Sequence, residues 1–217
     1  MKTISALVLA AGESKRMGGK HKLLLPLAGK TMIACTIDAI LQTNIAEVVV
    51  VLGYEAEAIK KILGVRPLKM VHNLDYPQGM ASSIHAGLAA LSPAATAVMI
   101  CLADQPLIQP AELNLLLAAF LQTPGKTIAV PTFQNQRGNP VIFDLSYRDE
   151  MLALKGDIGG KAILARHPEA VLEVEMPTGN VLEDADTPEA YARITAIEKR
   201  KFRKKQEIID DNALFRF

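Results

Sequence analysis

Basic and small side chains follow directly after the first apolar segment of the chain. The run Ile4–Leu9 is followed within thirteen residues by Ala10, Ala11, Gly12, Ser14, Lys15, Arg16, Gly18, Gly19, Lys20 and Lys22. Small residues let backbone N–H groups approach an anion, and Arg16 and Lys22 can neutralise an anion that carries several charges. The segment therefore predicts a phosphate-binding loop with a triphosphate as its ligand. The alternative is a glycine-rich surface loop whose lysines only interact with solvent.

Two common phosphate motifs do not account for this loop. A Walker A loop has the form G-x-x-x-x-G-K-[ST], but Gly12 and Gly18 are six residues apart and "GKH" ends in His21. The dinucleotide fingerprint G-x-G-x-x-G is absent from the sequence. The loop nevertheless follows the first strand of a predicted α/β sheet, and such sheets bind ligands at the carboxyl ends of their strands.

Acidic residues in two later segments could hold a divalent cation beside such a phosphate. Asp104 follows the apolar run Ala97–Leu102, so its carboxylate would project from the end of another strand. Asp184 and Asp186 are two residues apart and share one face if their segment is extended. Mg²⁺ binds one or two carboxylates together with phosphate oxygens, which makes these three residues candidate ligands. Alternatively, Asp104 only starts the turn before Pro106, and one of the pair is only a charge at a helix N-terminus.

Three further segments carry polar or flexible residues at predicted turns. In the segment Gly79–Leu88, Ser82 and Ser83 would lie in the first turn of a helix, whose free N–H groups suit a ribose, a base edge or a phosphate. Two serines at a helix start are equally ordinary caps. The other two segments are "RGNPV", with Gly138 and Asn139, and "GDIGGK", with Asp157 and Gly159. For each of them, simple turn formation and a binding role are equally good explanations.

Short β-branched runs alternate with longer segments of helical period, which is the pattern of repeated β-α units. Strands are expected at Ile4–Leu9, Val48–Leu52, Lys69–His72, Ala97–Leu102, Ile128–Pro131, Val141–Phe143 and Val171–Val174. Helices are expected at Met32–Gln42, Ala56–Leu63, Ser82–Leu91, Glu112–Leu121, Arg148–Leu154, Lys161–Ala165 and Glu189–Lys205. Prolines 110 and 188 stand where a proline opens a helix, with Thr187 as an N-cap. The pattern predicts an α/β domain, a three-layer α/β/α sandwich around a mostly parallel, Rossmann-like sheet.

Composition and charge set limits on the partners of the chain. The 24 basic and 23 acidic residues give a formal net charge of +1, so no overall field attracts nucleic acid or a membrane surface. Cys35 and Cys101 lie in apolar runs without metal-ligand spacing, which fits small buried hydrophobic residues in a reducing cytoplasm. No apolar run reaches the roughly 18 residues of a membrane span. The charged "ESKR" stands where a signal peptide would have its cleavage site, so we expect a cytoplasmic protein.

The last part of the chain differs from the rest in its charge. Residues 1–196 contain no linker rich in Pro, Gly or Ser and are expected to form one domain, with residues 197–217 as a charged tail. The segment Glu198–Lys205 carries six positive charges and one negative charge. We interpret it as the solvated end of the last helix, where cations are favoured. A docking tail for a partner is the alternative.

Six segments resemble, in order, the motifs of one family. The opening segment "LAAGESKRMGGKHKLL" is similar to the signature L-A-x-G-x-S-x-R-M-G, a short spacer and K-x-L-L of the small-molecule nucleotidyltransferases related to molybdenum cofactor biosynthesis. The other five are "GMASSIHAGL", "LADQPLI", "RGNPVIF", "GDIGGKAIL" and "EDADTPEAY". Together they span residues 4 to about 195 and look most like the molybdenum cofactor cytidylyltransferases.

This resemblance implies the nucleotide-diphospho-sugar transferase type of sandwich and assigns roles to residues. The implied catalytic residues are Arg16, Lys22 and Asp104, and the implied metal ligands are Asp104, Asp184 and Asp186. The implied nucleotide contacts are Leu9, Ala10, Ala11, Gly12, Ser14, Gly79, Ser82 and Ser83, and the second substrate would contact Gly138, Asn139, Asp157 and Gly159. Many relatives have two residues between R-M-G and the lysine, whereas three intervene here. We match Lys22 because three leucines follow it, with Lys20 as the alternative.

The implied reaction couples CTP to the terminal phosphate of molybdopterin, with Mg²⁺ as cofactor and pyrophosphate as the leaving group. A molybdoenzyme that receives the product would be the protein partner. Ala11 stands where the guanylyl branch of the family has glycine, so CTP is expected to be preferred over GTP. Two alternatives remain: a nucleotidyltransferase for another small phosphate such as a sugar phosphate, and a non-catalytic carrier of the molybdenum cofactor.

Overall fold

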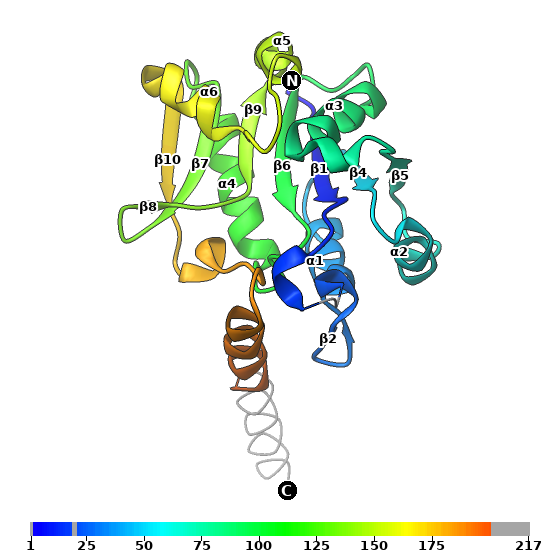
Figure 1. Ribbon diagram of the computed structural model, residues 1–217. Helices are drawn as coiled ribbons and strands as arrows, with labels where there is room; N and C mark the ends of the chain where they lie inside the picture. Colours follow the sequence, from blue (N-terminus) through cyan, green and yellow to red (C-terminus); the bar gives the residue numbers. More distant parts are fainter. Residues whose placement is uncertain (1, 19–20, 201–217) are drawn as a thin grey trace, which may run out of the picture.

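An eight-stranded sheet forms the centre of the molecule in the computed structural model, which describes residues 2–18 and 21–200 (Figure 1). In spatial order its strands are β10 (Val171–Glu175), β7 (Ile128–Phe133), β9 (Val141–Asp144), β6 (Ala97–Leu102), β1 (Ile4–Ala10), β4 (Glu47–Leu52) and β5 (Lys69–His72), with β8 (Gln136–Arg137) paired to β7. β9 is antiparallel to β6 and β7, and β8 is antiparallel to β7. The pairs that β1 makes with β4 and β6, β4 with β5, and β7 with β10 are parallel.

The seven strands expected from the sequence are all present, and their bounds differ from the expected ones by two residues or fewer. The predicted three-layer sandwich around a mostly parallel sheet is therefore confirmed. Two features were not expected: β8, and a hairpin of β2 (Pro26–Leu27) and β3 (Lys30–Thr31) outside the main sheet.

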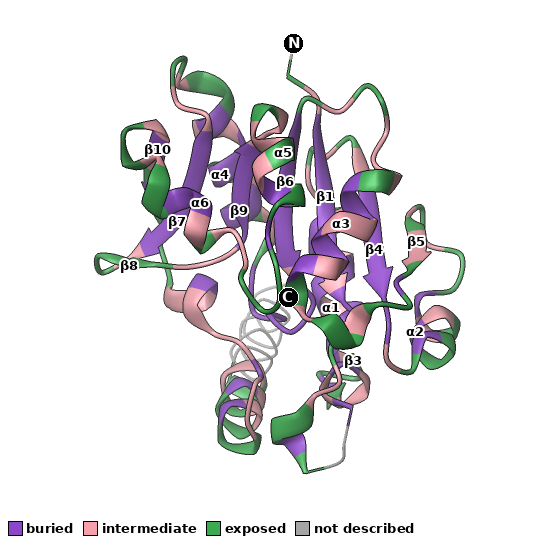
Figure 2. Cartoon of the chain, turned by 45° about the horizontal axis from the view of Figure 1, so that its top comes forward, coloured by how far each residue is buried: buried purple, intermediate pink, exposed green. Residues whose placement is uncertain are grey.

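Helices cover both faces of the sheet. One face is packed by α1 (Met32–Leu41), α2 (Ala56–Leu63) and α4 (Pro110–Gln122), and the other by α3 (Met80–Ala90), α5 (Arg148–Leu152) and α6 (Lys161–Arg166). Successive side chains of a strand point to opposite faces, so β1 gives Val8 to the first layer and Leu7 to the second. Figure 2 shows the central strands β1, β4 and β6 buried along most of their length, while helices such as α2 combine buried and exposed faces.

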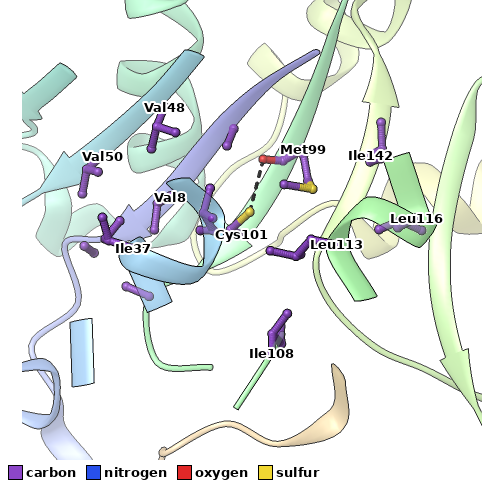
Figure 3. Packing of buried hydrophobic residues seen from close by; sticks show 14 of the residues in the cluster. Val8, Ile37, Val48, Val50, Met99, Cys101, Ile108, Leu113, Leu116 and Ile142 are labelled. Atoms are coloured by element: carbon purple, nitrogen blue, oxygen red, sulfur yellow. Dashed lines mark hydrogen bonds between the residues drawn. The ribbon is translucent and has the colours of Figure 1, made fainter. Parts of the chain in front are cut away.

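Branched aliphatic side chains fill the space between the sheet and the α1–α4 layer (Figure 3). Val8 and Val50 belong to the same cluster as Ile37 of α1 and Leu113 of α4. Cys101 is also buried there, with its thiol 3.7 Å from the carbonyl oxygen of Met99, and burial raises the pKa of that thiol. The residue therefore stays protonated and packs as a small hydrophobic residue, as its apolar neighbours in the sequence indicate.

The last described segment, residues 188–200, is helical and packs beside the β2–β3 hairpin. The Ala190 N–H donates to Thr187 Oγ1 (3.2 Å), so Thr187 caps this helix as predicted. Ile194 is fully buried in a small cluster with Leu27 and Met32, against which Ile197 also packs. The domain boundary expected after residue 196 thus falls inside the helix, and residues 201–217 of the expected tail lie outside the described residues.

The three parallel neighbours β6, β1 and β4 end at the same edge of the sheet, toward the lower part of Figure 1. The segments that follow them therefore come together there, although they are far apart in the sequence. Among the described residues, no helix has the length and apolar character needed to span a membrane.

Candidate active site

A cavity of about 550 Å³ lies at the carboxyl ends of β1 and β6. It brings together most residues that the sequence nominated. Those that line it are Leu9, Ala10, Ala11, Gly12, Ser14, Arg16, Lys22, Gly79, Ser83, Asp104, Asp157, Asp184 and Asp186. The other nominated residues, Ser82, Gly138, Asn139 and Gly159, are not among the described residues that line it. Gly19 and Lys20 lie outside the described part of the chain.

Lys22 lies between two carboxylates of this cavity. It begins the short 3-10 turn η2 (Lys22–Leu24), which the buried side chain of Leu23 fixes to the core. The Lys22 backbone N–H donates to Ser14 Oγ (3.1 Å), and its Nζ donates to Asp104 Oδ2 and to Asp186 Oδ1 (2.5 Å). Burial acts to lower the pKa of Lys22, but these two carboxylates outweigh it and raise that pKa. The ammonium therefore stays charged in the cavity.

Arg16 reaches the same acidic cluster from the loop after β1. It belongs to the 3-10 turn η1 (Lys15–Met17), which is anchored by the buried Met17. Arg16 Nη2 lies 2.6 Å from Asp186 Oδ2. Its neighbour Lys15 pairs with Glu13 (2.7 Å). Of these two adjacent cations, only Arg16 joins the Asp186 network.

The acidic residues come from two segments that are tied together at the backbone. The Ala185 N–H donates to the carbonyl oxygen of Asp104 (3.1 Å), which places Asp184 and Asp186 beside Asp104. Burial acts to raise the pKa of Asp186, but the hydrogen bond and charge of Lys22, together with Arg16, lower it. Burial raises the pKa of Asp184, and the carboxylates of Asp186 and Asp104 raise it further.

The carboxylates suit a divalent cation in their chemistry and in their charge. Asp184 makes no hydrogen bond or ion pair with any residue that the structure describes, and the repulsion from Asp186 and Asp104 outweighs the attraction from Lys22 and Arg16. Within the described residues, no three side chains of His, Cys, Asp or Glu are arranged to hold a metal by themselves. Mg²⁺ needs only one or two carboxylates when phosphate oxygens supply further ligands, so this donor set fits Mg²⁺ together with a nucleotide.

A buried carboxylate holds the segment that leads to Asp184. Glu112, which is 4% exposed, accepts hydrogen bonds from Thr178 Oγ1 (2.5 Å), from Asn180 Nδ2 (3.1 Å) and from the backbone N–H of Gln109 (2.8 Å). This role could not be predicted from the sequence, because the contacts join the first turn of α4 to a segment about 65 residues further on.

Gly138 and Asn139 support that same segment. The carbonyl oxygen of Val181 accepts hydrogen bonds from the Asn139 N–H (3.0 Å) and from Gln105 Nε2 (3.2 Å). The backbone of Gly138 packs so closely against Val181 that a Cβ there would collide with its carbonyl group. Both residues therefore contact the chain that carries the acidic pair instead of lining the cavity.

Asn73, at the end of β5, organises the first turn of α3. Its Nδ2 donates to Ser82 Oγ (2.9 Å) and Ser83 Oγ (3.1 Å), and it is nearly fully buried. Ser83 lines the cavity, whereas Ser82 turns its hydroxyl to the carbonyl oxygens of Asp75 and Gly79. Sequence reasoning missed Asn73. A short amide side chain between a strand and a helix start is the signal that could have found it.

The N-terminus of α3 is already occupied by another part of the chain. The Met80 N–H faces Asp157 Oδ1 (3.3 Å), and the Ala81 N–H donates to the carbonyl oxygen of Gly156 (2.9 Å). Gly79 has φ +105°, and a Cβ there would collide with the backbone of Gly156. These two N–H groups, which the sequence suggested as free for a ligand, are therefore hydrogen-bonded to the segment that contains Asp157.

Comparison with known families agrees with the chemistry of this cavity. The family described as "MobA-like NTP transferase domain" matches residues 6–171. The chain belongs to this family. The resemblance to small-molecule nucleotidyltransferases that the motifs indicated is thereby confirmed, and the molecule is a nucleotidyltransferase of the MobA-like type.

Two relatives of this NTP transferase align over most of their own length. Nicotine blue oxidoreductase of Paenarthrobacter nicotinovorans is 30% identical over 198 residues, which are 88% of this chain and 96% of that protein. Purine catabolism protein PucB of Bacillus subtilis (strain 168) is 31% identical over 194 residues, 84% of this chain and 91% of that protein.

The crystal structure of Rv0371c from Mycobacterium tuberculosis H37Rv superposes with a TM-score of 0.81 at 30% identity, and covers 90% of this chain and 98% of that one. A second structure of Rv0371c, in complex with manganese, superposes with a TM-score of 0.73 at 27% identity, over 90% of this chain and 99% of that one. The NTP transferase thus shares its architecture with these relatives over nearly the whole described domain.

Proposed function

We propose that this nucleotidyltransferase couples CTP to the terminal phosphate of molybdopterin and releases pyrophosphate. The observation that carries the proposal is the charge arrangement of the cavity. Two cations, Arg16 and Lys22, and three carboxylates meet at the carboxyl ends of the parallel strands β1 and β6. Cations of this kind suit a triphosphate, and a group of carboxylates that outnumbers the cations suits the divalent cation that accompanies it. The segment motifs shared with molybdenum cofactor cytidylyltransferases support CTP and molybdopterin as the substrates.

In the proposed reaction, an oxygen of the acceptor phosphate attacks the α-phosphorus of CTP. A bond forms between them, the bond from the α-phosphorus to the oxygen of the β-phosphate breaks, and pyrophosphate leaves with the electron pair. A phosphate monoester is largely dianionic at neutral pH, with a second pKa of about 6, so no side chain has to remove a proton. Lys22 and Arg16 would position the triphosphate and neutralise the charge that develops on the leaving group.

We assign Asp104, with Asp184 or Asp186, as the residues that would hold Mg²⁺. When bound, the cation would supply positive charge to the phosphate oxygens. The unpaired Asp184 supports the assignment, and so does the complex of the related Rv0371c with manganese, another hard divalent cation. The chain's own part is to hold the three carboxylates close together, which the contacts of Lys22 and Arg16 with Asp186 and the Ala185 backbone contact do.

The remaining contacts follow from the placement of the lining residues. We propose that the nucleotide lies against Leu9, Ala10, Ala11, Gly12 and Ser14 on one side and against Gly79 and Ser83 on the other. Ser82, whose hydroxyl donates to the carbonyl oxygens of Asp75 and Gly79, would support this side without contacting the nucleotide. The second substrate would enter beside Asp157 and Gly159. Gly138 and Asn139 would act on it only through the Val181 segment that they support.

The experiment that tests this function measures pyrophosphate release by the purified full chain with CTP, Mg²⁺ and molybdopterin, and identifies the product by mass spectrometry. We expect a cytidylyl–molybdopterin product. Asp104→Asn should lower the rate roughly 100-fold or more, because it removes a charge shared by Lys22 and the cation site. The exposed Asp149→Asn, on α5, is the matched control and should leave the rate unchanged. No product with molybdopterin, under conditions where another phosphate acceptor reacts, would overturn the assignment.

Other functions predict different results in the same assay. A transferase for a sugar phosphate would release pyrophosphate only with that acceptor, and a molybdenum cofactor carrier would release none. One relative is named an oxidoreductase, which makes a redox reaction the second candidate. Such an enzyme would consume a redox cofactor without releasing pyrophosphate from CTP.

A further inference from the structure

The two ends of the cavity differ in their chemistry. β1 lies between β6 and β4 in the sheet, so the cavity at its carboxyl end extends toward both neighbours. The charged cluster of Lys22, Asp104 and Asp186 lies on the β6 side. On the β4 side, Ala11 and Tyr76 line the cavity and meet above Gly53 at the end of β4.

Tyr76 is seated directly on the backbone of Gly53. A Cβ added to Gly53 would lie 2.7 Å from Cβ and Cγ of Tyr76 and 2.8 Å from Cβ of Ala11. Only glycine leaves room for this approach. The Tyr54 N–H donates to the carbonyl oxygen of Ala11 (3.2 Å), and this hydrogen bond joins the ends of β1 and β4 beneath Tyr76.

The backbone on both sides of Tyr76 is held by hydrogen bonds. The Asp75 N–H donates to Asn73 Oδ1 (3.0 Å), and the carbonyl oxygen of Asp75 accepts from Ser82 Oγ (2.9 Å). The Gly79 N–H donates to the carbonyl oxygen of Tyr76 itself (3.1 Å). Tyr76 therefore starts the turn η3 (Tyr76–Gln78) with its position fixed from below and from both sides.

We propose that Tyr76 is a specificity-determining residue that limits the size of the nucleobase. The inference rests on the proposed function, because a triphosphate bound at the cluster of Lys22, Asp104 and Asp186 would extend its base toward the β4 side of the cavity, where Tyr76 lies. A fixed aromatic ring would offer a face on which a one-ring pyrimidine stacks, and it would reduce the space available to a two-ring purine. Ala11 is only 5% exposed, and its methyl group packs above Gly53 beside Tyr76. Ala11 would therefore affect the base mainly by helping to position the Tyr76 ring.

The test measures nucleotide binding without any acceptor, so it does not depend on the identity of the second substrate. Calorimetry on the full chain with Mg²⁺ gives the dissociation constants of CTP and GTP for the wild type and its variants. The ratio of the GTP dissociation constant to the CTP dissociation constant measures the preference for CTP. Tyr76→Ala should lower this ratio by roughly 10-fold or more, because the ring that excludes the larger base is removed. Tyr76→Phe, which keeps the ring, should retain the ratio. Tyr147→Ala is the matched control, because that ring packs on His167 and does not line the cavity.

Each outcome decides between the alternatives. A ratio in Tyr76→Ala that stays at the wild-type value overturns the inference, and so does an equal weakening of both nucleotides, which would indicate a structural role. If circular dichroism shows that Tyr76→Ala is unfolded, Tyr76→Leu, which keeps an apolar contact with Gly53, is judged by the same criterion. A wild type that binds both nucleotides equally overturns the inference alone. A wild type that binds no nucleotide with Mg²⁺ overturns the proposed function as well.

Discussion

At the scale of single residues, Lys22 is the side chain on which the charge balance of the cavity depends. It contacts Asp104 and Asp186 at once, and Arg16 contacts the second oxygen of Asp186. Two cations therefore face three carboxylates, with Asp184 as the excess negative charge. An incoming triphosphate adds further negative charge, so Lys22 can turn to it only when its two carboxylates receive another cation. The network thus favours binding of nucleotide and divalent cation together.

This balance predicts different effects for two nearby lysines. The Lys22 side chain is 14% exposed and belongs to the network, whereas the Lys15 side chain is 79% exposed and pairs only with Glu13 among the described residues. Lys22→Met should lower kcat/KM for CTP by about 100-fold or more, because a fixed charge aimed at the phosphates is lost. Lys15→Met should change it by only a few-fold, since exposed charges are screened. Steady-state kinetics at two salt concentrations measures both. Equal, salt-sensitive losses would indicate a diffuse field instead of a defined phosphate site.

Individual site residues could be read from the sequence where a charge follows a strand. Arg16, Lys22 and Asp104 were nominated in this way, and the structure places them around one cavity. Asn73 and Tyr76 could not be found by the same reasoning, because their roles depend on contacts with residues of other segments. The position of Tyr76, for example, depends on the missing side chain of Gly53.

At the scale of elements, long periodic segments were predictable and short ones were not. The buried runs of β1, β4 and β6 stand out by their branched residues, whereas β2, β3 and β8 have two residues each, too few for any period. The covering of the α3 N-terminus by Gly156 and Asp157 was equally inaccessible, because it is a tertiary contact between segments about 75 residues apart. Local sequence sets an element's type, and packing decides which of its ends remain open to a ligand.

One element-level contact, between α4 and the segment around Asn180, should control both stability and nucleotide binding. Glu112→Ala leaves the donors of Thr178, Asn180 and Gln109 without their acceptor, and it should lower the free energy of unfolding by about 2–4 kcal/mol. It should also weaken CTP binding with Mg²⁺, because the segment that carries the acidic pair loses its anchor. Urea denaturation and calorimetry measure the two effects.

The matched control for this substitution is Glu57→Ala on α2. The Glu57 side chain is 84% exposed and pairs with Lys60 on the same helix, so its loss should leave the free energy of unfolding nearly unchanged. If the two variants were equally stable, the buried carboxylate would not be the anchor that its hydrogen bonds suggest.

At the scale of the whole molecule, the candidate site needs both ends of the described chain. Arg16 and Asp186 are 170 residues apart in sequence, yet they form one ion pair. The helix of residues 188–200 supports the same region from outside, because Tyr191 donates its hydroxyl to the carbonyl oxygen of Pro26 (2.5 Å). Pro26 begins the β2–β3 hairpin, two residues after the turn that positions Lys22. The last helix therefore helps to hold the first loop in place.

This arrangement predicts that two truncations will behave differently. Removing residues 201–217 should leave thermal stability and pyrophosphate release unchanged, because the packing of the last helix on the hairpin involves Tyr191, Ile194 and Ile197, all of which remain. A chain that ends at residue 187 loses this packing and should unfold at a lower temperature. Burial of one aliphatic side chain such as Ile194 is worth about 2–5 kcal/mol in large-to-small substitutions, so Ile194→Ala in the full chain should reproduce part of the loss. Thermal unfolding followed by circular dichroism, together with CTP affinity, measures both effects. A chain ending at residue 187 with wild-type stability and affinity would show that the helix is an appendage, and that the domain ends before it.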